Sequence, residues 1–187
     1  MSIVIVYHSG YGHTKIVAEY VLKGVLIETP QAILLTTSEA QSNIDLLHQA
    51  DTIVFGSPTY MGSVSAEFKK FMEFTGKFWY KQPWKNKLAA GFTNSSTLNG
   101  DKLNTLQQIC LFAAQHSMLW VSMGILPKFE NDRQLEEPNG LGSYLGLMTL
   151  SNNSTQEIIA PKGLETAELF GKRIAQITHK LKNNHNL

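Results

Sequence analysis

Cysteine is nearly absent from the sequence, because Cys110 is the only one among 187 residues. No disulfide can therefore form within the chain, which is typical of proteins in a reducing compartment. Long apolar runs are absent too. No stretch approaches the ~20 residues that a membrane-spanning helix needs, and no basic leader precedes the first apolar segment. We expect a cytoplasmic protein without membrane insertion.

An excess of charge of one sign is also missing. The 16 basic and 15 acidic residues give a formal net charge of +1, and no basic cluster indicates a nucleic-acid surface. The six histidines are scattered and lack the His-x-x-x-His spacing of metal sites. We therefore expect neither a nucleic acid nor a metal ion as a ligand.

Apolar runs and amphipathic segments alternate along the chain, which predicts an α/β fold. With 43% hydrophobic residues, the chain is expected to form one well-buried domain over residues 1–187. Expected strands are 2–7, 32–35, 52–56, 88–92 and 118–122, and expected helices are 13–27, 43–50, 64–75, 102–117 and 163–182. Residues 124–161 are rich in Gly, Asn, Pro and Ser without a clear period, and predict a long loop near the active site.

Five parallel strands with helices on both faces predict a flavodoxin-like three-layer sandwich. Its crossovers should be right-handed, and its strand order should be 2-1-3-4-5. In this order a ligand binds beyond the carboxyl ends of the first and third strands, where the strand order reverses.

A short polar turn, Ser9-Gly10-Tyr11-Gly12-His13-Thr14, connects the first strand to the first helix. The unpaired N–H groups at a helix start attract anions, and the two glycines would allow a ligand to approach the backbone closely. The turn lacks the third glycine of a dinucleotide fingerprint and the Gly-Lys-Ser/Thr of a Walker loop. Its pattern favours the phosphate of a mononucleotide such as FMN, with an ordinary polar turn as the alternative.

Two further polar turns are expected at the same edge of the sheet. One contains Pro58, Thr59, Tyr60, Met61 and Gly62, and the other contains Thr93, Asn94, Ser95, Ser96, Thr97 and Asn99. Main-chain and hydroxyl groups in these turns could hydrogen-bond a flavin ring beside the apolar surface of Tyr60 and Met61. Polar turns are common at strand ends, but three of them at these strands favour an FMN site.

These segments, 7–14, 56–62 and 92–96, resemble the flavodoxin-like NAD(P)H:quinone oxidoreductases of the Trp-repressor-binding-protein-A-like family. The resemblance continues through residues 75–79, 115–118 and 170–173, so it covers nearly the whole chain. It implies that FMN is bound by Ser9–Thr14, by Thr59–Met61 and by Asn94–Asn99, and that Tyr11 also contacts the nicotinamide. The implied activity is the two-electron reduction of a small quinone-like acceptor by NADH or NADPH.

The resemblance also implies roles for His116 and Trp79. His116 would lie beside the flavin, where an imidazole could hydrogen-bond a carbonyl and supply a proton. A helix-capping or core histidine is the alternative. Trp79 would wall the quinone pocket from a neighbouring subunit, or be anchored beneath a loop. The aromatic set Phe78, Trp79, Tyr80 and Trp84 favours self-association as a homodimer or homotetramer.

Other functions stay open because the chain departs from the family pattern. Its third turn has a glycine only at Gly100, and His116-Ser117-Met118 replaces the usual His-Gly-Met. A flavodoxin-type electron carrier is one alternative, although a net charge of +1 disfavours the acidic docking surface of such carriers. A reductase of free flavin, azo or nitro compounds and a non-enzymatic binding module are the others.

Overall fold

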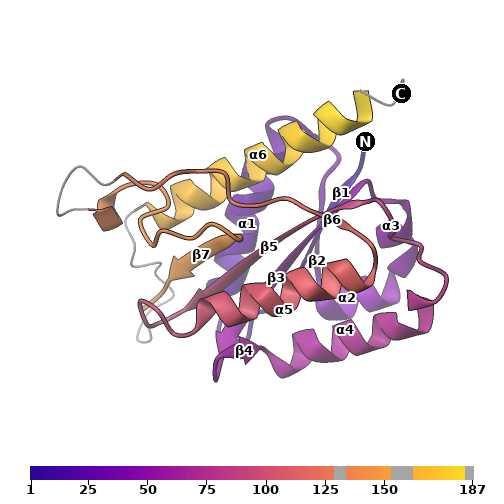
Figure 1. Ribbon diagram of the computed structural model, residues 1–187, viewed down its shortest axis with the longest axis horizontal. Helices are drawn as coiled ribbons and strands as arrows, with labels where there is room; N and C mark the ends of the chain where they lie inside the picture. The colour runs from indigo at the N-terminus through magenta and orange to yellow at the C-terminus, as the bar shows by residue number, and fades with distance from the viewer. Residues whose placement is uncertain (129–133, 153–161, 184–187) are drawn as a thin grey trace.

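A parallel sheet forms the centre of the computed structural model, which describes residues 1–128, 134–152 and 162–183 (Figure 1). The order β2 (Ile33–Thr36), β1 (Ile3–Tyr7), β3 (Thr52–Tyr60), β5 (Leu88–Ser95), β6 (Leu119–Trp120) runs across it. Two more strands lie off this path: β4 (Ser63–Val64) pairs antiparallel with β3, and β7 (Leu147–Leu150) pairs parallel with β5. Every residue of β1 is buried, as expected for a continuous apolar run in a covered parallel sheet.

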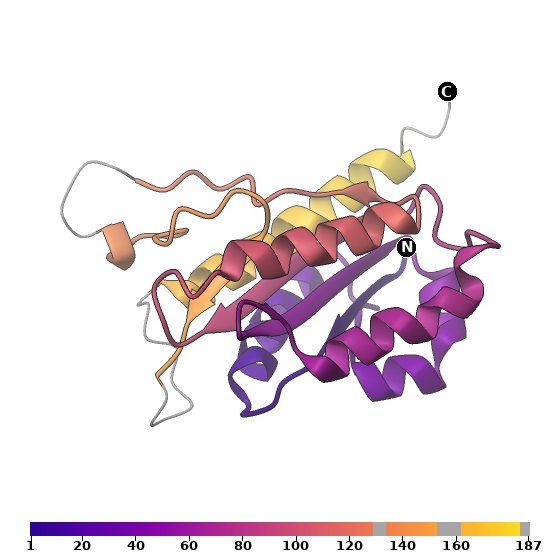
Figure 2. The same ribbon diagram turned by 60° about the horizontal axis from the view of Figure 1, so that its bottom comes forward.

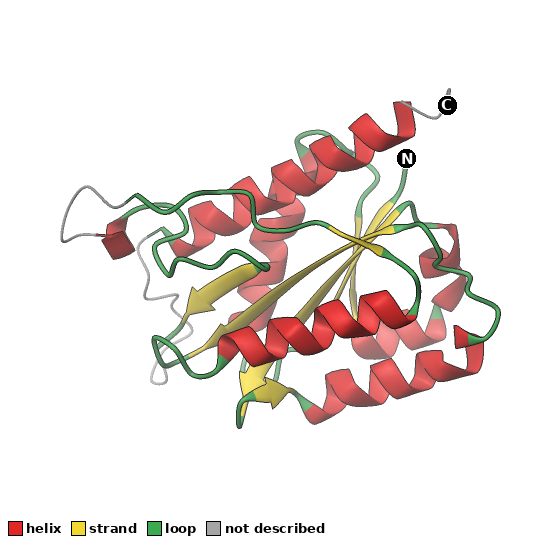
Figure 3. Cartoon of the chain, viewed as in Figure 1, coloured by secondary structure: helices red, strands yellow, loops and turns green. Residues whose placement is uncertain are grey.

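Helices cover both faces of the sheet (Figure 3). On one face lie α1 (His13–Leu26) and α6 (Gly163–Asn183), with Val21 and Phe170 in their core. The other face carries α2 (Thr37–Ser42), α3 (Ile44–Gln49), α4 (Ala66–Trp79) and α5 (Lys102–Gln115), and its core contains Phe55, Phe68 and Phe112. Figure 2 shows α4 and α5 in front of the sheet and α6 behind it. This arrangement confirms the predicted flavodoxin-like α/β fold.

The fifth strand differs from the expected strand 118–122. Only β6 forms there, beside Leu88 and Ala89 at the start of β5. Beside Phe92–Ser95, at the end of β5, its place is taken by β7. The expectation of a loop throughout 124–161 is therefore wrong for Leu147–Leu150, a run too short to be separated from its glycine-rich surroundings by pattern alone. Residues 129–133 and 153–161 of that loop lie outside the described residues.

Other boundaries also shift. The expected helix 43–50 forms as α3, and the short helix α2, which was not expected, precedes it and begins with a capping box between Thr36 and Glu39. The ladder between β3 and β5 continues through Ser57 and Pro58, which pair with Thr93 and Asn94. Both strands are therefore longer than expected, and the second and third turns are correspondingly shorter.

Within the described residues, no helix is both long and apolar enough to cross a membrane.

Candidate functional site

The first turn lies between the carboxyl end of β1 and the start of α1. Gly12 precedes the helix with φ at 93°, in the left-handed region that favours glycine, and its N–H donates to Ser9 Oγ at 3.0 Å. Thr14 is buried in the first turn of the helix. In the described part of the chain, no side chain caps this helix start. The positive end of the α1 dipole is thus available to an anion such as a phosphate.

Tyr60 extends from the end of β3 across this first turn. A Cβ added at Gly10 would lie 2.5 Å from Tyr60 Oη, so glycine is required for the approach. The Gly10 backbone hydrogen-bonds the Tyr60 hydroxyl, whereas burial raises the pKa of Tyr60. The rings of Tyr11 and Tyr60 meet edge to face with centroids 6.1 Å apart, and Met61 beside them is fully exposed. The first two turns therefore meet at an aromatic surface against which a flat ring could pack.

Beneath these turns, buried hydroxyls join the ends of β3 and β5. Thr59 Oγ1 lies 2.7 Å from Thr93 Oγ1 and donates to Thr105 Oγ1 of α5 at 2.8 Å. Asn94 donates to Ser151 Oγ through Nδ2 and accepts from Thr149 Oγ1, each at 2.9 Å. The expected turn positions are wrong for six residues that lie in strands, namely Pro58, Thr59, Tyr60, Thr93, Asn94 and Ser95.

The third turn, residues 96–101, closes around a lysine side chain. Lys102, the first residue of α5, is fully buried and donates from Nζ to the carbonyl oxygens of Thr97, of Leu98 at 3.0 Å and of Asn99 at 3.3 Å. Burial lowers the pKa of Lys102 to about 8. No sequence pattern pointed to Lys102, because a lysine at a helix start is ordinarily solvated.

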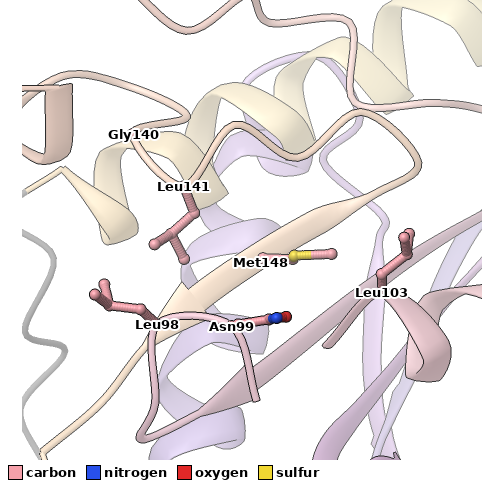
Figure 4. Close-up of a pocket in the computed structure, with 6 residues that line it drawn as sticks. All are labelled: Leu98, Asn99, Leu103, Gly140, Leu141 and Met148. Carbon is pink, nitrogen blue, oxygen red and sulfur yellow. The ribbon is translucent and has the colours of Figure 1, made fainter. Parts of the chain in front are cut away.

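A pocket of about 360 Å³ lies beside the third turn (Figure 4). Its lining is mostly apolar and consists of Leu98, Asn99, Leu103, Gly140, Leu141 and Met148. The helix that follows the turn is tied to the second turn, because Asn104 Nδ2 donates to the Gly62 carbonyl at 2.7 Å. The third turn thus adjoins both the second turn and this pocket.

Trp79 and His116 lie at the opposite edge of the sheet. Each ends a helix that begins near the turns and runs back to the amino ends of the strands. Ser117 accepts from the backbone N–H of Asn86, just before β5 begins, and Trp79 Nε1 donates to the Gln115 carbonyl at 2.8 Å. Within one chain, neither side chain reaches the first turn. The expected contact between His116 and the flavin therefore stays a prediction that would need a neighbouring chain.

His116 is enclosed by aromatic rings. It is 2% exposed, with ring centroids 4.4 Å from Trp84 and 5.0 Å from Phe112, and its Nε2 lies 3.0 Å from Thr75 Oγ1. Burial, with a smaller contribution from His48, lowers the pKa of His116 to about 4. The imidazole is therefore neutral near pH 7, in a setting that matches the core-histidine alternative.

The exposed aromatic surface at this edge is smaller than the set predicted from the sequence. Trp84 is 1% exposed, and its Nε1 donates to His48 Nδ1 at 3.1 Å, so it belongs to the core. Trp79 and Tyr80 are 46% and 89% exposed. They form the exposed aromatic surface at this edge.

Comparison with known proteins decides the family. The model of the NADPH-dependent FMN reductase family matches residues 8–127, which is more than half of the chain. The chain belongs to the NADPH-dependent FMN reductase family. The matched range includes all three turns at the carboxyl edge.

Similar proteins match this FMN reductase family member over nearly its whole length. Flavodoxin FldP of Pseudomonas aeruginosa is 41% identical over 95% of this chain and 97% of its own. An NAD(P)H dehydrogenase (quinone) of Geobacter sulfurreducens is 30% identical over 97% and 99%. The crystal structure of a flavodoxin, WrbA-like protein from Agrobacterium tumefaciens matches with a TM-score of 0.74 and 38% identity, covering 96% and 98% of the two chains. The resemblance predicted from the turns is confirmed.

Proposed function

We propose that the chain is an FMN-dependent oxidoreductase that uses NADH or NADPH to reduce quinone-like acceptors by two electrons. The observation that carries the proposal is the meeting of three features at one sheet edge. The first is the start of α1, which no side chain among the described residues caps. The second is the close contact between Gly10 and Tyr60, and the third is the turn whose carbonyl oxygens accept hydrogen bonds from Lys102. Membership of an FMN reductase family and the quinone dehydrogenase relatives support the same function.

The described residues fit FMN. Ser9–Thr14 would hold the phosphate and ribityl chain, because no side chain among the described residues caps the start of α1 and the helix dipole favours an anion there. Tyr60, Met61 and Gly62 would flank the ring on one side, and Ser95–Asn99 would flank it on the other. The chemistry that bound FMN supplies is hydride acceptance from a nicotinamide and delivery of two electrons to an acceptor.

Exposed side chains around the turns would dock the other reactants. Tyr11 is 74% exposed and Met61 is fully exposed, so both are available to a nicotinamide or a quinone ring. Their apolar surfaces would orient such rings and exclude water from them. Strand residues Pro58, Thr59, Thr93 and Asn94 would contribute through the backbone, since the side chains of the last three already have internal partners.

A second copy of the chain would be needed for Trp79 or His116 to take part. The exposed Trp79 and Tyr80 side chains support a homodimer or homotetramer in which this edge covers a neighbour's turns. His116 would then act from a buried position against the rings of Trp84 and Phe112. Light scattering on purified protein tests self-association, and a monomeric mass would contradict it.

A flavodoxin-type electron carrier is the second candidate, because the relative at 41% identity is named a flavodoxin. The net charge of +1 supports the enzyme instead, since carriers use acidic surfaces to steer their partners. A cytoplasmic location and the choice between NADH and NADPH stay predictions.

Steady-state kinetics on FMN-loaded protein separates the two candidates. The enzyme is expected to oxidise one NADH or NADPH for each benzoquinone reduced, with ping-pong kinetics. A carrier would show no such turnover and would reduce cytochrome c by single electrons once it is reduced chemically. Protein that binds no FMN at all would contradict both candidates.

A further inference from the structure

We propose that Lys102 is a positioning residue for the flavin, which shapes the third turn into a set of outward N–H donors backed by a buried positive charge. The proposal deepens the proposed FMN function and rests on it. It concerns a residue that neither the family pattern nor the comparisons single out.

The carbonyl groups of the third turn face the Lys102 ammonium. Nζ of Lys102 donates to three successive carbonyl oxygens, those of Thr97, Leu98 and Asn99. In a trans peptide the C=O and the N–H point in opposite directions. The N–H groups of Leu98, Asn99 and Gly100 therefore point away from the ammonium. No peptide in the described residues is cis, so this relation holds for all three units.

The charge on Lys102 is the second feature of this turn. Among the described residues, no ion pair includes Lys102, and burial lowers the pKa of its ammonium. The neighbouring Asp101 is turned toward the second turn, where a Cβ at Gly62 would lie 3.9 Å from its Oδ2. A buried ammonium without a carboxylate is costly to maintain unless a specific structure requires it. The carbonyl cage satisfies the ammonium, and its positive charge is not cancelled by an acid.

The composition of the turn explains why this chain uses a lysine here. The turn Asn94-Ser95-Ser96-Thr97-Leu98-Asn99 contains no glycine, so its backbone is less free to fold tightly than a glycine-rich turn. Three inward carbonyls would repel one another without a cation between them. Lys102 supplies that cation and so fixes the direction of the N–H groups.

Outward N–H groups with a positive charge behind them form an anion-attracting surface. A flavin presents ring carbonyls as acceptors and gains negative charge near N1 on reduction, so this surface should favour the reduced form more than the oxidised form. We expect Lys102 to increase FMN affinity and to raise the reduction potential.

The test compares Lys102→Met, Lys102→Arg and a matched control, Lys180→Met, at an exposed position in α6 on the other face of the sheet. Calorimetry gives the dissociation constant of oxidised FMN, and dye equilibration gives the midpoint potential. Lys102→Met should bind oxidised FMN several-fold more weakly and reduced FMN about tenfold more weakly still. That further factor lowers the two-electron potential by about 30 mV. Lys102→Arg should keep most of the potential, and Lys180→Met should match the wild type.

If Lys102→Met does not fold, hydrogen exchange on the wild-type protein tests the outward N–H groups directly. FMN should protect the amides of Leu98, Asn99 and Gly100 from exchange. The proposal is overturned if these amides stay unprotected in FMN-bound protein, or if a folded Lys102→Met variant keeps the wild-type potential. Failure of the wild-type protein to bind FMN would instead overturn the proposed function.

Discussion

Replacing Gly10 by alanine tests how the first two turns fit together. The new Cβ would lie 2.5 Å from Tyr60 Oη, where ordinary contacts begin at 3.4 Å. Either the tyrosine ring or the turn must then move by close to 1 Å, on the order of the misplacement that weakens a preorganised site severely. The tyrosine would also lose its hydrogen bond to the Gly10 backbone, which stabilises by about 1 kcal/mol. We expect Gly10→Ala to weaken FMN binding about tenfold.

Tyr60→Phe provides the partner for a double-mutant cycle. Without the hydroxyl, the nearest ring atom to the new Cβ is Tyr60 Cζ at 3.4 Å, which is an ordinary contact. Gly10→Ala should therefore cost much less in the Tyr60→Phe background, with a coupling of about 1 kcal/mol between the two sites. Calorimetric titration of the four apoproteins with FMN measures this coupling. Equal losses in both backgrounds would refute the contact between Gly10 and Tyr60.

Three further predictions concern stability. Gly12→Ala places a Cβ in left-handed backbone and should cost about 1–2 kcal/mol, with a melting temperature lower by roughly 2–8 °C; an unchanged melting temperature would contradict the turn geometry. Thr59→Val leaves the buried hydroxyls of Thr93 and Thr105 without this partner and should cost about 1–3 kcal/mol in urea unfolding, whereas Ser42→Ala, at an exposed helix end, should cost much less. Because the pKa of His116 is lowered in the folded protein, the unfolded chain takes up a proton first as the pH falls from 6.5 to about 4. The free energy of unfolding should therefore decrease across that window by up to about 3 kcal/mol. A His116→Gln variant should lose less over the same window, and an identical pH profile would show that His116 is not the group responsible.

Much of the fold was predictable from the sequence because it depends on periodicity. The apolar run Ile3–Tyr7 and the amphipathic pattern of α6 follow directly from burial on both faces of a sheet or on one face of a helix. The split of the fifth strand was not predictable in this way. Whether Leu147–Leu150 joins β5 depends on contacts with residues far away in sequence, such as the ladder to Phe92–Ser95.

The candidate site was predictable where it depends on local chemistry. The turn Ser9–Thr14 has its glycines and hydroxyls within six residues of sequence, so its anion-binding character could be predicted. The environments of His116 and Lys102 could not be. The burial of His116 depends on the ring of Trp84, which is far away in sequence. The burial of Lys102 depends on its side chain folding back onto the preceding turn.

The central claim is that three turns at the carboxyl edge form one FMN site, and a crystal structure of the protein with FMN tests it most directly. The account predicts the phosphate at the start of α1 and the ring between Tyr60–Gly62 and the turn closed by Lys102. A ring bound elsewhere, or crystals grown with excess FMN that show none at this edge, would contradict it.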